Sequence, residues 1–255
     1  YHNVLEEYVV EKEIEESTRL LVGEDLKKEI NTPLFSHAIL SHRHGVSVNP
    51  LKLTQNLSSV IEKRGVSVYE NTNVLHVNGK IAKTHHAKIE FKKIIWAIDA
   101  AHPSEKVKNL KSTIIVTKKL TRNQLKKTGM VKKKIIWSSK ENYGYLKIIT
   151  KDKRLLVGFG GLIVHKKHKR TDPHFPHLKQ IELFIKKLFP YLNLKFEYGW
   201  SGTFGVTDNW MPIIERKVNS ISIAGAGSQV VCVMVAKHIA HKLLGKPSSL
   251  DSFFR

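Results

Sequence analysis

The stretch "ISIAGAGSQVVCVMVAKHIAHKLLG", residues 221–245, is the most informative part of the sequence about the fold. Ile221–Ala224 is short and apolar, as in a buried strand, and Gly225-Ala226-Gly227 follows it as a turn. Residues 229–244 then predict a helix that ends at Gly245. A strand, a glycine turn and a helix bring backbone N–H groups and the positive end of the helix dipole together, which suits an anion or an electron-rich carbonyl. A Gly-x-Gly segment also makes ordinary tight turns, so both interpretations stay open at this point.

Shorter segments upstream carry clear boundary signals. Asn49 is a good helix N-cap, Pro50 suits the first helical position, and Gly65 suits the position just past the end. Asn78-Gly79 predicts a hairpin turn. The segment "KKIIWAIDA", residues 92–100, is an apolar run that ends in small residues.

The remaining segments predict further helices and strands. Residues 6–26 are rich in Glu and Lys and predict an exposed helix, and residues 176–188 predict a helix with an apolar face. Four strands of an antiparallel sheet are predicted in the middle of the chain. The predicted strands are, in order, 66–68, 74–77, 80–83, 88–91, then the four central strands 112–119, 134–138, 143–150 and 154–158, and finally 194–200.

Composition narrows the class of protein. The chain has 255 residues, 41% of them hydrophobic, which is enough for a core, and no apolar run approaches the roughly 20 residues of a membrane span. The single cysteine, Cys232, excludes an intrachain disulfide, favours a reducing cytoplasm and is expected to be buried. A net charge of +21 permits association with nucleic acid but supports it only weakly, because no zinc-finger, RNP-type or helix-turn-helix motif accompanies the lysines. No cluster at metal-ligand spacing is found, so no metal is expected.

Several stretches together carry a family resemblance. They are "VNPLKLTQNL" (48–57), "EKRGVSVYENTNVLHV" (62–77), "KKIIWAIDA" (92–100), "GYLKIITKDKRLLVG" (144–158), "FPYLNLKFEYGWSGTFGVTDNWMPII" (189–214) and the opening stretch, 221–245. In this order and spacing the chain resembles the glycine/D-amino-acid oxidase superfamily of FAD-dependent oxidoreductases, with the gamma-glutamylputrescine oxidase-like branch as the nearest likeness. The resemblance extends over roughly residues 20–245.

The resemblance implies noncovalent FAD and a set of cofactor residues. Val74 would offer backbone contacts to the adenine, while Ala97, Asp99 and Ala100 lie on the segment that passes the dinucleotide. The family usually has glycine at the position of Asp99. The loop and helix start implied to face the flavin ring and the ribityl chain are Gly225, Ala226, Gly227, Ser228, Gln229 and Val230.

It also implies residues on the substrate side. Tyr143, Tyr145 and Lys147 stand where related enzymes place aromatic and basic residues, and Trp200 and Thr203 are expected to line the pocket near the ring. Many relatives have arginine at the position of Lys147, and lysine keeps that charge without the bidentate fork. No catalytic residue is assigned.

The implied fold class is α/β with two interleaved domains. Residues 45–109 and 199–255 would form an FAD-binding Rossmann-type domain, and residues 1–44 and 110–198 a mixed-sheet substrate domain. The G-x-G-x-x-G turn that opens such a domain does not occur before Gly45. We therefore expect an N-terminally truncated chain that lacks the first βαβ unit and by itself holds FAD poorly.

The implied reaction is oxidation of the C–N bond of a small amine or amino acid, with hydride transfer to the flavin and an imine as product. Oxygen or another acceptor would reoxidise the flavin. Two alternatives stay open. One is a flavoprotein of the same fold that modifies tRNA wobble uridines, which would give the basic surface a purpose. The other is a non-catalytic remnant, favoured by the missing turn and by the departures at Asp99 and Lys147.

Overall fold

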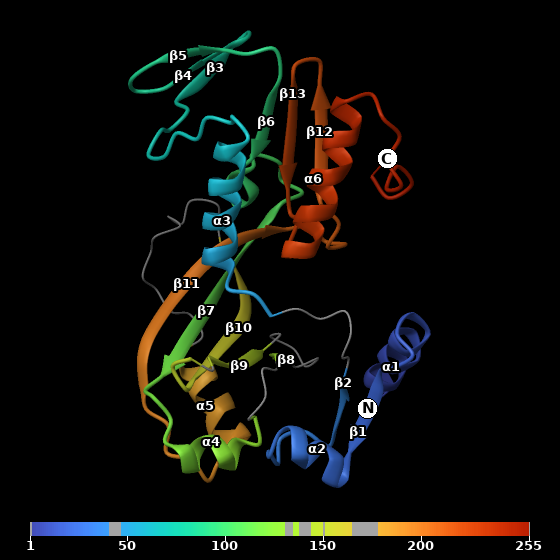
Figure 1. The fold of residues 1–255 in the computed structure, drawn as a ribbon, viewed down its shortest axis with the longest axis vertical. Helices are drawn as coiled ribbons and strands as arrows, with labels where there is room; N and C mark the ends of the chain where they lie inside the picture. The colour runs from blue at the N-terminus through green and yellow to red at the C-terminus, as the bar shows by residue number, and fades with distance from the viewer. Residues whose placement is uncertain are drawn as a thin grey trace. The chain divides into compact units, whose positions relative to one another are not determined.

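The computed structural model describes residues 2–40, 47–130, 135–137, 144–149, 151–164 and 178–254. The chain divides into two compact units. Unit 1 comprises residues 1–48, 111–162 and 171–202, and unit 2 comprises residues 49–110, 163–170 and 203–255. Each unit combines helices with strands (Figure 1), so the predicted α/β class is confirmed.

The largest sheet has five strands, most of whose residues belong to unit 1. Its strand order is β11-β7-β10-β9-β8, and β9 runs antiparallel to both β8 and β10. The strands are β7 (Lys108–Thr117), β8 (Ile135–Trp137), β9 (Tyr145–Ile149), β10 (Arg154–Val164) and β11 (Phe196–Val206). The four strands predicted in the middle of the chain therefore form, together with β11, one sheet.

The core of unit 1 contains the inward side chains of this sheet. Leu146 and Ile148 alternate with half-buried residues along β9, as the two-residue period of a strand requires. Two helices, α4 (Arg122–Thr128) and α5 (Leu178–Leu188), belong to the same unit. The core includes Leu146, Ile148, Leu155, Val157, Ile181, Ile185, Leu188 and Phe189, which are all buried.

The N-terminal segment is not one helix. A strand, β1 (Arg19–Val22), separates α1 (His2–Ile14) from α2 (Gly23–Glu29), so the helix predicted over residues 6–26 is wrong. β1 pairs antiparallel with β2 (His37–Leu40), and Leu21 is buried. Pairing with a distant strand overrides the helical tendency of the local sequence.

Unit 2 contains a three-stranded sheet in the order β12-β13-β6. These strands are β6 (Ile94–Ala97), β12 (Ile213–Lys217) and β13 (Ser220–Ala224). β13 runs parallel to β6 and antiparallel to β12. A 3-10 turn, η1 (Asp99–Ala101), follows β6, and α6 (Gln229–Leu243) follows β13 (Figure 1). The strand, turn and helix predicted from residues 221–245 are therefore confirmed.

A second helix and a small sheet complete unit 2. In α3 (Pro50–Lys63) the Asn49 side chain accepts a hydrogen bond from the backbone N–H of Lys52 at 3.0 Å, which confirms the predicted cap. The strands β3 (His76–Asn78), β4 (Ile81–Lys83) and β5 (Lys88–Glu90) pair antiparallel, with Asn78-Gly79 in the first turn. Residues 66–68 form no strand.

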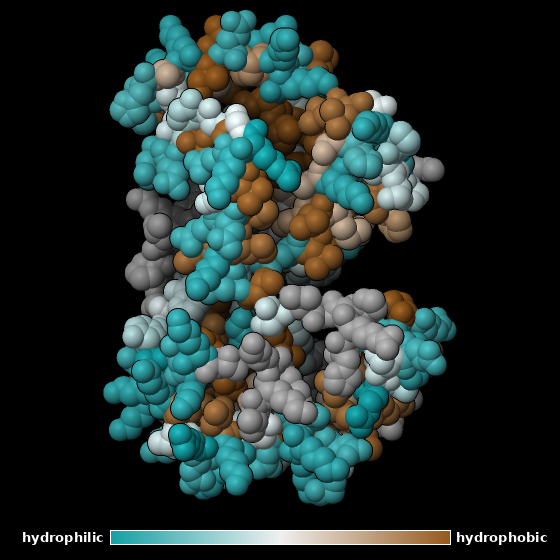
Figure 2. Space-filling view, viewed as in Figure 1, coloured by the Kyte–Doolittle hydropathy of each residue, from teal (hydrophilic) through white to brown (hydrophobic). Residues whose placement is uncertain are grey.

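Several apolar side chains of unit 2 stay at its surface. α3 has an apolar stripe, yet none of its residues is buried. Figure 2 shows hydrophobic side chains on the exposed surface over α6, where Val230 and Val233 lie about two-thirds exposed. Among the described residues, none of the helices has the length and apolar character needed to cross a membrane.

Candidate functional site

The parallel pairing of β6 and β13 brings two turns to the same end of the sheet. Ile223 lies opposite Ala97, so Asp99 and Gly225 each stand two residues beyond this pair. In open α/β sheets this carboxyl end is where ligands bind. The predicted cofactor residues that the structure brings together here are Ala97, Asp99, Ala100, Gly225, Ala226, Gly227, Ser228, Gln229 and Val230.

The glycine turn has a backbone that favours glycine. Gly225 has φ +72° and Gly227 has φ +58°, both in the left-handed region. Ser228 then caps α6, and its hydroxyl accepts a hydrogen bond from the N–H of Val231 at 3.3 Å. The first N–H groups of a helix have no partner within the helix, so Gln229 and Val230, which are exposed, present donors at the positive end of the dipole.

We call this end of the sheet, residues 97–100 and 225–230, the glycine corner. Asp99 lies in the turn after β6, on the other side of it from the glycine turn. Its backbone has φ +45°, uncommon for a residue with a side chain. One carboxylate oxygen, Oδ2, accepts a hydrogen bond from the N–H of Gly205 at 2.9 Å. A Cβ on Gly205 would lie 2.8 Å from Val107 Cγ1 and 3.1 Å from Asp99 Oδ1. Glycine at position 205 therefore lets β11 approach η1 closely.

Two further residues at this corner were missed by sequence reasoning. A Cβ on Gly225 would lie 3.0 Å from Thr207 Cγ2, and one on Gly227 would lie 3.7 Å from Trp210 Cε3. The Thr207 hydroxyl donates to the carbonyl of Met211 at 2.6 Å, and Trp210 has φ +59°. Asp208-Asn209 signals a turn in the sequence, but not that this turn packs against the glycine loop.

Cys232 lies in the first turns of α6. Its N–H donates to the carbonyl of Ser228 at 3.0 Å. The residue is exposed, so the expectation of a buried thiol is wrong. Neighbouring atoms still exclude part of the water around the sulfur, which raises the pKa of the thiol, and the negative charge of Asp99 raises this pKa further. The Asp99 carboxylate therefore acts electrostatically on the start of α6.

Val74 is not part of this corner. It lies just before β3, next to the separate three-stranded sheet of unit 2, and is 42% exposed. Its neighbour Leu75 donates its N–H to the carbonyl of Lys83 at 2.8 Å. The adenine contact predicted for Val74 stays a prediction.

Two predicted substrate residues share one face of β9. Tyr145 and Lys147 are half-buried and alternate with the core residue Leu146. The ring of Tyr145 lies 5.3 Å from that of Trp137 between centroids, and burial raises the pKa of its phenol. Lys147 Nζ donates to the carbonyl of Val48 at 3.4 Å. Tyr143 lies outside the described residues.

The other two predicted substrate residues are on β11. Trp200 is 45% exposed, and β7 and β10 separate its strand from β9 in the sheet. Thr203 is half-buried and belongs to unit 2, whereas Trp200 belongs to unit 1. The assignment of both residues to a substrate pocket stays a prediction.

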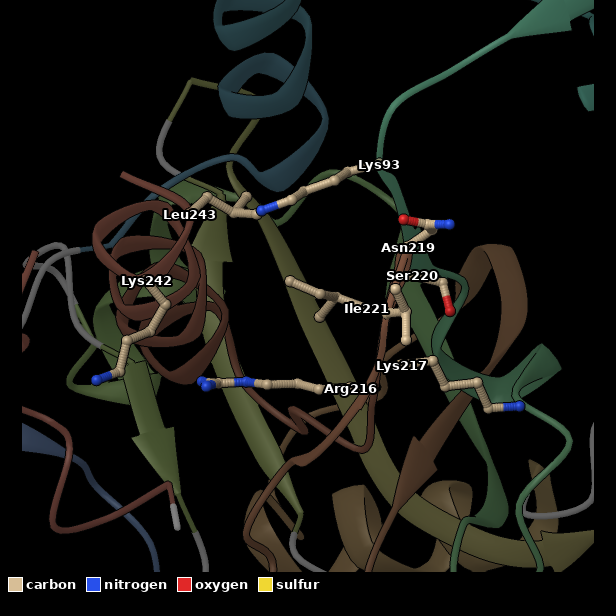
Figure 3. A pocket seen from close by; sticks show the side chains of 9 residues that line it. Lys93, Arg216, Lys217, Asn219, Ser220, Ile221, Lys242 and Leu243 are labelled. Carbon is tan, nitrogen blue, oxygen red and sulfur yellow. The ribbon is translucent and has the colours of Figure 1, made fainter. Parts of the chain in front are cut away.

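A cavity of about 180 Å³ lies at the opposite end of β6 and β13. Its lining includes Ser220, where β13 begins, and Leu243, where α6 ends. Lys93 and Arg216 extend across it toward α6, whereas Lys217 and Lys242 point away (Figure 3). Cations near the C-terminus of a helix complement the negative end of its dipole. Because the cavity lies at the opposite end of the two strands, it is distinct from the glycine turn after β13.

The part of the chain that the structure describes contains no group of three or more His, Cys, Asp and Glu side chains placed to hold a metal ion.

Comparisons with known proteins identify the family. The sequence model of the family described as "FAD dependent oxidoreductase" (DAO) matches residues 4–241. Glycine oxidase from Geobacillus kaustophilus matches with a TM-score of 0.77 and 14% identity, over 99% of this chain and 70% of that chain. The search of the curated proteins found no match.

Two further solved structures share the fold. L-proline dehydrogenase from P. horikoshii has a TM-score of 0.68 and 19% identity, over 93% of this chain and 67% of that chain. Iminodiacetate oxidase from Chelativorans sp. BNC1 has a TM-score of 0.69 and 15% identity, over 96% of this chain and 70% of that chain. The predicted resemblance to the glycine/D-amino-acid oxidase superfamily is confirmed, and because the family match extends over residues 4–241 of 255, this chain belongs to the FAD-dependent oxidoreductase (DAO) family, whose cofactor is FAD.

Proposed function

We propose that this chain oxidises the C–N bond of a small amine or amino acid, with FAD held noncovalently. The observation that carries the proposal is the corner at the carboxyl ends of β6 and β13. There a glycine turn, the start of α6 and η1 come together in a chain of a flavin-dependent family.

The residues at this corner fit a flavin. Gly227 carries no side chain, and a Cβ there would meet only Trp210, at ordinary contact distance. The exposed first turn of α6 offers N–H donors to the electron-rich carbonyl side of the ring. When bound, the flavin supplies the acceptor for a hydride from the carbon beside the substrate nitrogen. Some members of the family attach the flavin through a cysteine in the region of Thr203. The sequence of this region holds no cysteine, and the one cysteine of the chain is Cys232 on α6, which supports noncovalent binding.

Lys147 and Tyr145 are the side chains that would bind the substrate. The 3.4 Å bond from Lys147 Nζ to the Val48 carbonyl is long, so a substrate carboxylate would be a stronger partner for this ammonium. A tyrosine phenol is protonated at neutral pH, and burial raises the pKa of Tyr145 further, so its hydroxyl can donate a hydrogen bond. The structures that share the fold are named for glycine, L-proline and iminodiacetate, and each of these compounds carries both an amine and a carboxylate.

A reaction of this kind depends mainly on how the protein orients the substrate. Tyr145 is held by packing: a Cβ at Gly158 would overlap its ring, so glycine leaves the space in which this ring lies. An oriented, partly dry surface favours loss of hydride from a neutral amine without a strong base. Water then hydrolyses the imine, and oxygen or another acceptor takes the electrons.

The test uses the full chain with added FAD. Because the sequence has no G-x-G-x-x-G turn before Gly45, we expect FAD to bind weakly, and it is therefore supplied in large excess. We expect a panel of amino acids and matching amines to reduce the absorbance of the bound flavin without oxygen. Lys147→Ala should raise KM for amino acids at least about tenfold, as expected for loss of a charge-assisted bond, and should change the amines little. Lys151→Ala, an exposed lysine in the turn after β9, is the matched control.

Three results would contradict the proposal. The first is that the chain binds no flavin, and the second is that no amine or amino acid reduces the bound flavin. The third is that Lys147→Ala and Lys151→Ala change KM for amino acids equally. Salt-sensitive tRNA binding without turnover of amines would favour the tRNA-modifying alternative instead.

A further inference from the structure

Resting on the proposed flavin site, we propose that Asp99 is a positioning residue that sets the charge preference of that site. Its carboxylate fixes the end of β11 to the turn after β6 and places a negative charge beside the first turns of α6. The site then favours a neutral, oxidised flavin ring over an anionic, reduced one.

The geometry shows that the carboxylate is held in place. Asp99 adopts φ +45°, a conformation that side chains disfavour, and its Oδ2 accepts the N–H of Gly205 at 2.9 Å. The missing side chain at position 205 allows this approach. Glycine at position 99, the usual residue of the family, would adopt the same backbone but would leave the N–H of Gly205 without this acceptor.

The negative charge of Asp99 acts on the start of α6. The pairing of Ile223 with Ala97 sets the turn at Asp99 beside the turn at Gly225, from which α6 begins. The thiol of Cys232, in the first turns of that helix, has its pKa raised by burial and then by Asp99. A helix N-terminus attracts anions, so a fixed carboxylate at the same place opposes that attraction.

Two substitutions separate the hydrogen bond from the charge. Asp99→Asn keeps an oxygen acceptor for Gly205 and removes the charge, whereas Asp99→Gly removes both and relieves the backbone. Asp152→Asn, which removes an exposed carboxylate from the turn after β9, is the matched control. A folded Asp99→Asn variant is expected because the two side chains have the same shape.

The first readout needs no cofactor. Cys232 is the only cysteine, so the pH dependence of its alkylation reports the local charge in the full chain. We expect the thiol pKa to fall in Asp99→Asn and in Asp99→Gly, and to stay unchanged in Asp152→Asn. An unchanged thiol pKa in Asp99→Asn overturns the inference. Hydrogen exchange of the Gly205 amide should accelerate in Asp99→Gly and stay slow in Asp99→Asn, and equal exchange in both variants overturns the positioning role.

The second readout uses the chain with FAD. Asp99→Asn should bind reduced flavin at least about threefold more tightly relative to oxidised flavin, which appears as a more positive midpoint potential. If the unchanged chain and Asp99→Asn both bind FAD with the same midpoint potential, this inference is overturned and the proposed function stays intact. No flavin bound by either protein overturns the proposed function, whereas the thiol and amide readouts still decide how Asp99 is placed.

Discussion

A methyl group at position 205 tests how tightly the strand ends are packed. A Cβ on Gly205 would lie 2.8 Å from Val107 Cγ1, closer than carbon atoms approach without a shift, and 3.3 Å from the backbone nitrogen of Ala100. Gly205 is buried, so its neighbours have little room to move. We expect Gly205→Ala to lower the free energy of unfolding by about 1–3 kcal/mol, measured by urea denaturation.

The same strand provides the control. A Cβ on Gly202 of β11 would meet nothing within 4 Å. Because alanine also restricts the unfolded chain, Gly202→Ala should leave the stability unchanged or raise it by up to about 1 kcal/mol. Equal losses in both variants would show that β11 tolerates no alanine anywhere, and that the contact with Val107 has no special effect.

At the scale of elements, local signals predict the boundaries well. α3 begins after Asn49, the hairpin turns at Asn78-Gly79, and α6 runs between Ser228 and Gly245, each as the sequence indicates. A cap or a turn depends on residues within a few positions of one another, so one sequence carries the whole signal.

Contacts between distant segments explain what could not be predicted. β1 exists because it pairs with β2, and nothing in residues 19–22 alone distinguishes that strand from the helices on either side. The glycine loop could be named from the sequence, but Thr207 and Trp210 could not, because they reach it through the fold. Asp99 departs from the usual glycine of the family, which the sequence shows, but its partner Gly205 is 106 residues away.

One buried side chain joins the end of α6 to the C-terminal segment. His238 is fully buried, and its Nε2 lies 2.9 Å from Arg216 Nη2. Arginine only donates, so Nε2 accepts and Nδ1 carries the proton of a neutral ring. Nδ1 faces the Ser248 hydroxyl at 3.1 Å and the Asp251 carboxylate at 3.6 Å.

This arrangement predicts a loss of stability in mild acid. Burial and then the charge of Arg216 lower the pKa of His238 below its ordinary value of 6.5. The unfolded chain therefore binds the proton first, so the contribution of His238 is complete above about pH 6.5 and is lost as the pH falls below that value. Comparing His238→Gln with the unchanged chain, the difference in Tm should be large at pH 7.5 and smaller at pH 5.

His85→Gln is the control, because His85 is exposed. Its stability should follow that of the unchanged chain at both pH values. The pKa of Asp251 is lowered by its hydrogen bond with Lys242, so this carboxylate loses its contribution only in more acidic solution, below about pH 4. A difference between His238→Gln and the unchanged chain that grows toward pH 5 would contradict the neutral ring.

At the scale of the whole molecule, the excess of 43 basic over 22 acidic side chains dominates the electrostatics. Several ion pairs in the described part of the chain, such as Lys27 with Glu24, are exposed. Exposed pairs stabilise a fold by at most about 1 kcal/mol each. The net charge of +21 therefore leaves the folded chain with considerable self-repulsion.

Salt should relieve this repulsion. The Debye length falls from about 30 Å at 0.01 M to about 8 Å at 0.15 M, shorter than the distance between most exposed charges of a domain. We expect Tm at pH 7 to rise by about 2 °C over this range of NaCl, because screening stabilises the compact state more than the expanded one. The same titration near the sequence pI of about 9.9 is the control, since net repulsion is small there and the rise should nearly vanish. A fall in Tm with salt at pH 7 would instead mean that attractive pairs outweigh the excess of positive charge.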